Sequence, residues 1–69
     1  MNATVRRRAV LSTGEVAELL HVSKRSVLNW AASRGMPSYA TPGGHLRFRP
    51  HELVRWLRDS GMDVPEELA

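Results

Sequence analysis

The stretch Pro42-Gly43-Gly44 limits the structures open to this chain more than any other feature. Proline fixes φ and glycine adopts positive φ without steric cost, so these residues predict a tight turn. Basic and apolar residues alternate after the turn, and successive side chains of a strand point to opposite faces. We therefore expect a β-hairpin, from residues 38–41 and 45–49, with one basic and one apolar side: His45, Arg47 and Arg49 against Leu46 and Phe48.

Two short amphipathic segments precede this hairpin. Ser12 followed by Glu15 has the form of a capping box, and apolar residues then recur at helical spacing, which predicts a helix over about residues 13–20. Ser23 is the expected N-cap of a second helix that ends near Gly35, with an apolar side formed by Val27, Trp30 and Ala31. Two short helices joined by about three residues predict a helix-turn-helix.

A third helix is expected after the hairpin. Pro50 suits its first turn, Gly61 suits its C-terminal cap, and its apolar side is Leu53, Val54, Trp56 and Leu57. The predicted fold is mainly α, with three helices and a two-stranded hairpin. Its expected parts are a flexible basic arm over residues 1–10, a domain over residues 11–61, and a short acidic tail over residues 62–69, where Val64 and Leu68 could pack back on the domain.

The length of 69 residues allows one domain, which buries only about 60% of its unfolded surface and leaves no room for a catalytic cleft between subdomains. The absence of cysteine excludes disulfides and cysteine-bound zinc. We also find no apolar run of about 18 residues and no signal-peptide pattern, so a cytoplasmic protein without membrane contact is the simplest expectation.

No arrangement of residues predicts an enzyme, a cofactor or a metal site. The three histidines lack the spacing of a metal motif, and the serines occupy positions typical of helix caps and helix surfaces. Gly43-Gly44 is not followed by the Lys-Ser/Thr pair of a phosphate-binding loop. Trp30 and Trp56 fall on apolar helix sides and are expected in the core.

The charge is divided unevenly along the chain. Residues 1–49 contain eight basic and two acidic residues, a net charge of +6, whereas residues 50–69 contain two basic and five acidic residues, a net charge of −3. A polyanionic partner would therefore meet the first two-thirds of the chain. The alternative is a solvated basic face without a partner. Similarly, the run Arg6, Arg7, Arg8 could lie on phosphates, enter a minor groove, or only increase solubility.

The outward side of the second helix has a composition suited to DNA. It carries Lys24, Arg25, Ser26 and Asn29 and no acidic residue. Such side chains bind base edges or phosphates, and the N-terminal part of the second helix enters the major groove in helix-turn-helix proteins. The alternative is an exposed helix face that is basic by chance.

The ordered set of motifs over residues 11–37 and 41–57 resembles the MerR-like winged-helix domains, most of all the small excisionase-type and BldC-like proteins. The matching positions are Leu11, Glu15, Val16, Ala17, Val22, Ser23, Ser26, Val27, Trp30, Gly35, Gly43, Gly44, His45 and Phe48. The resemblance implies binding to double-stranded DNA, with the second helix in the major groove and the hairpin, called the wing, on the backbone or in the flanking minor groove. The implied contact residues are Ser23, Lys24, Arg25, Ser26, Asn29, His45, Arg47 and Arg49, joined by Arg6, Arg7 and Arg8 of the arm.

The chain also departs from these relatives. Many of them have arginine where this chain has Leu46, and a basic residue where it has Ala40. It lacks the long dimerisation helix and the effector region of full MerR regulators, so neither a stable dimer nor small-molecule sensing is expected, although several copies could self-associate cooperatively on DNA.

Three interpretations therefore remain open. The first is a bacterial, nucleoid-associated DNA-binding protein that acts as a transcription regulator or an architectural factor. The second is a protein-interaction module whose basic face meets an acidic partner, which Leu46 and Ala40 would favour. The third is the DNA-binding piece of a larger protein.

Overall fold

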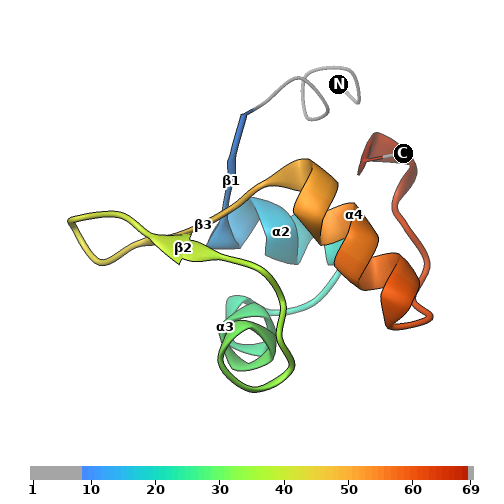
Figure 1. The fold of residues 1–69 in the computed structure, drawn as a ribbon, viewed down its shortest axis with the longest axis horizontal. Coiled ribbons are helices and arrows are strands. Elements are labelled where there is room, and N and C mark those ends of the chain that lie inside the picture. Colours follow the sequence, from blue (N-terminus) through green and yellow to red (C-terminus); the bar gives the residue numbers. More distant parts are fainter. Residues whose placement is uncertain (1–8, 69) are drawn as a thin grey trace.

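The computed structural model describes residues 9–68, which form three helices, one three-stranded antiparallel sheet and a short 3-10 turn (Figure 1). The predicted fold class, a small, mainly α winged helix-turn-helix, is confirmed. The predicted arm residues Arg6, Arg7 and Arg8 lie outside the described residues. The elements are β1 (Leu11–Ser12), α2 (Thr13–Leu20), α3 (Lys24–Ser33), β2 (Tyr39–Ala40), β3 (Leu46–Phe48), α4 (Pro50–Asp59) and η1 (Glu66–Leu68).

The sheet has one strand more than the sequence predicted. Strand β3 lies in the middle, paired with β2 on one side and with β1 on the other. Strand β1 is only two residues long, too short to show an alternating pattern, and it is recognisable only through the pairing of Leu11 with Phe48, which are both fully buried. The hairpin of β2 and β3 extends away from the helices, on the opposite side of the molecule from α4 (Figure 1).

The starts of α2 and α3 follow the expected capping residues, whereas the C-cap of α4 is Ser60 and the expected Gly61 follows it. At the start of α2, the Glu15 N–H donates to Ser12 Oγ at 3.1 Å and the Ser12 N–H donates to Glu15 Oε1 at 2.8 Å, so the capping box is complete. The helix ends at His21, which has a left-handed φ of 59°, and the Val22 N–H returns to the Ala17 carbonyl at 3.0 Å. This reversal of the chain joins α2 to α3.

The hydrophobic core takes side chains from almost every element. Its members are Leu11, Val16, Ala17, Val27, Met36, Phe48, Leu53, Leu57 and Leu68. Val64 packs against this cluster, so the end of the chain returns to the domain as expected. The partly buried Trp30 and Trp56 lie with their ring centroids 6.1 Å apart, and the Trp56 Nε1–H donates to the Arg34 carbonyl at 3.1 Å. These contacts fix α4 against the end of α3.

Within residues 9–68, none of the helices is both long enough and apolar enough to span a membrane. The same part of the chain contains no group of three or more histidine, cysteine or carboxylate side chains placed to hold a metal ion.

Candidate nucleic-acid interface

One side of α3 is open to solvent and carries polar and basic side chains. Lys24, Arg25 and Asn29 are exposed, whereas Val27 on the opposite side is fully buried. No acidic residue occupies the first turn of the helix, and neither Lys24 nor Arg25 has an ion pair among the residues that the structure describes. Two cationic groups therefore lie on the exposed surface of α3.

The two predicted serine contacts belong to the N-cap of α3. Ser23 Oγ accepts a hydrogen bond from the Ser26 N–H at 3.1 Å and donates one to Ser26 Oγ at 3.1 Å. The Ser23 hydroxyl is therefore used within the helix start, and Ser26 is half-buried beside it. This local network holds the first turn of α3, from which Lys24 and Arg25 extend.

Lys24 crosses from α3 to the first turn of α2. A Cβ atom added to Gly14 would lie 3.1 Å from Lys24 Cε and 3.7 Å from Lys24 Nζ, so the lysine stem lies directly against the Gly14 backbone. Glycine leaves the space that the lysine stem occupies. The ammonium group is thereby placed at the positive end of the α2 dipole, where an anion is favoured.

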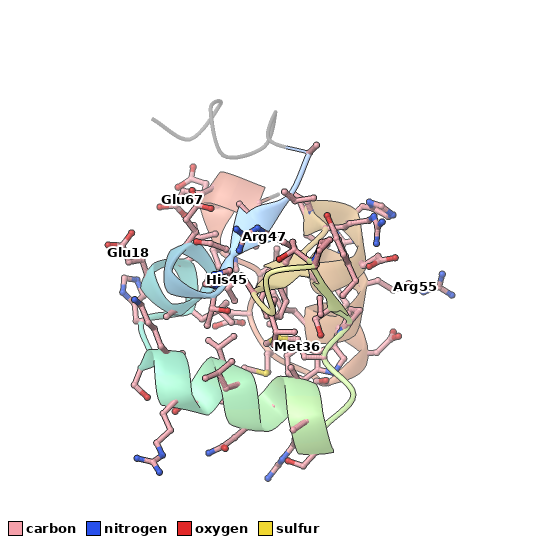
Figure 2. The ribbon with its side chains drawn as sticks, turned by 90° about the vertical axis from the view of Figure 1, so that its left-hand side faces the viewer. Glu18, Met36, His45, Arg47, Arg55 and Glu67 are labelled. Atoms are coloured by element: carbon pink, nitrogen blue, oxygen red, sulfur yellow. The ribbon has the colours of Figure 1, made fainter. Side chains whose placement is uncertain are left out.

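A shallow groove of about 230 Å³ joins this point to the hairpin. The start of α2, the start of α3 and strand β3 all contribute to it, and none of its lining residues is acidic: Ser12, Thr13, Gly14, Lys24, His45, Leu46 and Arg47. His45 and Arg47 lie next to each other above α3, while Glu18 lies to one side and Arg55 points away on the other (Figure 2). The fold thus brings Lys24 together with two of the three predicted basic residues of the hairpin.

The hairpin turn explains the position of His45. The Gly44 N–H donates to the Thr41 carbonyl, and the Thr41 N–H donates to the His45 carbonyl, both at 2.8 Å. Only Gly44 of the glycine pair has a positive φ, of 85°, while Gly43 does not. A three-residue loop with its last residue left-handed closes the hairpin tightly, and His45 is exposed next to its tip.

The two hairpin arginines have different surroundings. Arg47 lies on the central strand between Ser12 and Tyr39, is half-buried, and donates from Nη1 to the Leu46 carbonyl at 3.0 Å. The guanidinium carbon of Arg49 instead lies 4.3 Å from the centroid of the Tyr39 ring, and its Nη1 is 4.0 Å from Glu52 Oε1. Arg49 therefore connects the hairpin to the start of α4.

The two positions that depart from the relatives have different environments. Leu46 is half-buried and packs against the core, so its side chain has a structural role in this chain. Ala40 is exposed and pairs with Leu46 across the hairpin.

Three residues near the interface were not predicted from the sequence. Tyr39 stacks on Arg49, Gly14 lies under Lys24, and Leu28 is exposed on α3. The Tyr39 and Gly14 contacts join residues ten positions apart in the sequence, so no local pattern reveals them. The exposure of Leu28 could have been predicted from the sequence, because helical spacing puts this residue on the outer side of α3, one turn after Lys24.

Comparison with known proteins identifies the family of the domain. A family model described as "Helix-turn-helix domain" matches residues 10–61, which include all three helices and the hairpin and make up more than half of the chain. No significant match was found among curated proteins or among solved structures. The chain belongs to the helix-turn-helix domain family.

Proposed function

We propose that this protein binds double-stranded DNA sequence-specifically, with α3 in the major groove and the β2–β3 wing on the backbone or in the flanking minor groove. The observation that carries the proposal is the groove in which Lys24 of α3 meets His45 and Arg47 of the wing without an acidic neighbour in its lining. Membership of the helix-turn-helix family supports DNA as the partner.

The size and chemistry of α3 fit this role. Ten residues make a helix about 15 Å long, and the major groove, about 12 Å wide, admits an α-helix. Arginine and lysine pair with guanine O6 and N7, and asparagine pairs with adenine N6 and N7. Arg25 and Asn29 are therefore proposed as base contacts, while Lys24, directed toward the wing, is suited to a base edge or a phosphate.

The wing and the arm are proposed to hold phosphates. Phosphate contacts fix the position and orientation of a protein on the duplex, whereas base contacts supply sequence preference. His45 and Arg47 line the same groove as Lys24 of α3, and Arg6, Arg7 and Arg8 are proposed as further phosphate contacts. Arg49 has partners within the protein, so its proposed main effect is to orient the wing. Ser23 and Ser26 support the start of α3, and their proposed contacts to DNA are limited to the phosphate backbone.

The finer assignment rests on the resemblance to MerR-like, excisionase-type proteins. It supports a role as a small transcription regulator or architectural factor, working in the cytoplasm on the nucleoid, without a small-molecule effector. Cooperative binding of several copies to adjacent sites belongs to the same proposal. The competing role, a module for an acidic protein partner, depended on Leu46 and Ala40, where many relatives have basic residues. Leu46 packs against the core, so this position has a structural role in this chain under either interpretation.

Substitution at the start of α3 tests the proposal. The double change Lys24→Ala with Arg25→Ala should weaken specific binding by roughly 1–3 kcal/mol for each base that the substituted side chain no longer recognises. Fluorescence anisotropy of a duplex selected by the wild-type protein would measure the change. Arg55→Ala with Arg58→Ala is the matched control, because it removes the same charge from exposed positions of α4. Equal losses in both double variants would show a non-specific charge effect and refute the assignment of α3.

A further inference from the structure

Leu28 is the one large hydrophobic side chain left strongly exposed within residues 9–68, with 47% of its surface accessible. Neither the buried core nor the half-buried residues packed against it include Leu28. Exposure of a single leucine is common on protein surfaces and has no meaning without a location. The location of Leu28 is therefore what matters.

Leu28 lies within the proposed DNA-binding surface of α3. Residues four positions apart on a helix lie one above the other, so Lys24, Leu28 and Ala32 form a row along the side of α3. Lys24 begins this row in the groove beside the wing, and the parallel row on the outer side contains Arg25 and Asn29. On the side of the helix start, the neighbours of Leu28 are Lys24 and Arg25, which are proposed to contact DNA, and on the other side they are Ala31 and Ala32.

The chemistry of the major groove offers one kind of apolar target. The base edges in the major groove present mainly hydrogen-bond donors and acceptors. The apolar group among them is the C5-methyl group of a pyrimidine. Apolar side chains recognise thymine through contact with this methyl group. A single large exposed hydrophobic side chain is matched to one methyl group better than to an extended apolar partner surface, which would need a larger contiguous patch.

We infer that Leu28 is a specificity-determining residue that packs against the C5-methyl group of a pyrimidine in the major groove. This inference rests on the proposed function and adds a preference that charged and amide side chains do not supply. Thymine carries this methyl group in ordinary DNA, and 5-methylcytosine carries the same group at the same edge of the base. Both ligands share the chemistry, and the experiment separates them.

The test uses the full chain and a duplex selected by the wild-type protein from a random-sequence pool. Each thymine is replaced in turn by deoxyuridine, which removes only the methyl group, and each cytosine is replaced in turn by 5-methylcytosine. Affinities are measured by anisotropy for the wild type and for Leu28→Ala. Asn29→Ala is the matched control on the neighbouring row. Circular dichroism checks that each variant folds, which is expected because both positions are exposed.

The expected result is a position at which the methyl group strengthens wild-type binding about fourfold, the factor that corresponds to about 0.8 kcal/mol for one buried carbon. In Leu28→Ala, the duplexes with and without this methyl group should bind with equal affinity. Asn29→Ala should bind both duplexes more weakly but still prefer the one with the methyl group. If replacing a thymine by deoxyuridine lowers the affinity, the methyl group that Leu28 contacts belongs to thymine. If methylating a cytosine raises the affinity, Leu28 contacts the methyl group of 5-methylcytosine.

Two results would overturn the inference while leaving the proposed function intact. In the first, adding or removing a methyl group at any position changes the affinity of the wild type by less than the error of the measurement. The other is a methyl effect that persists in Leu28→Ala, because another side chain would then be responsible. If the wild-type protein enriches no sequence and binds no duplex, the proposed function itself is wrong, and the inference fails with it.

Discussion

Single side chains explain much of how this small domain arranges its basic groups. Gly14 has space for Lys24 because it lacks a Cβ atom, and Tyr39 gives Arg49 an aromatic face at 4.3 Å. The result is a separation of roles among similar residues: Lys24 and Arg47 line the groove beside α3, while Arg49 connects the wing to α4. A count of basic residues would have treated the three as equivalent.

The strained residue at the helix-turn-helix reversal gives a test of stability. His21 has a φ of 59°, a conformation that costs a non-glycine residue roughly 1–2 kcal/mol, although histidine adopts it more readily than most residues. His21→Gly should therefore raise the free energy of unfolding by about 0.5–1 kcal/mol, since glycine loses part of the gain through its flexible unfolded state. Urea denaturation measures the change, and a clear loss of stability would contradict this account of the turn.

The helices and strands were predictable to different degrees. The starts of the three helices follow from local signals: Ser12 with Glu15, Ser23, and Pro50 in the first turn of α4. Their C-caps do not, because His21, Arg34 and Ser60 occupy these positions and Gly61 lies one residue beyond the cap of α4. Strand β1 could not be predicted, because two residues carry no periodicity and their pairing partner lies 37 positions away. The site shows the same limit: the outward residues of α3 follow from helical spacing, whereas the contact of Lys24 with α2 depends on tertiary packing.

The wing turn offers a matched pair of substitutions. Gly44 requires positive φ, and an alanine there would be strained by roughly 1–2 kcal/mol, which should loosen the hairpin and weaken DNA binding. Gly43→Ala is the control, because Gly43 has no positive φ and a Cβ there would make only an ordinary 3.5 Å contact with His45 Cδ2. Thermal denaturation and anisotropy of both variants should show a loss for Gly44→Ala alone. Equal effects would mean that the hairpin tip does not depend on the left-handed residue.

The domain as a complete unit depends on its last residues as well as on its helices. Leu68 of η1 is 7% exposed and belongs to the core cluster, although it lies beyond the three helices in the sequence. In a chain of 69 residues, each buried side chain is a substantial part of the total burial. The acidic end of the chain is therefore expected to stabilise the folded domain.

Two leucine substitutions test this dependence. Leu68→Ala should lower the free energy of unfolding by roughly 2–5 kcal/mol, the range for leucine truncation in a core. Leu28→Ala removes the same atoms from a side chain that is 47% exposed and should change stability by at most about 0.5 kcal/mol. Chemical denaturation of both variants compares them directly. A Leu68→Ala protein as stable as Leu28→Ala would show that η1 contributes little to the domain.

The central claim is that α3 and the wing together form a DNA-binding surface, and the salt dependence of binding tests it most directly. Anisotropy of a labelled duplex would be measured at several salt concentrations for the wild type and for Arg47→Ala, after circular dichroism has shown that the variant folds. Several phosphate contacts predict affinity that falls steeply with salt, and removing one phosphate-binding side chain should reduce the slope of log K against log salt by about 0.9. Wild-type binding that is absent at low salt, or a slope that Arg47→Ala leaves unchanged, would contradict the claim.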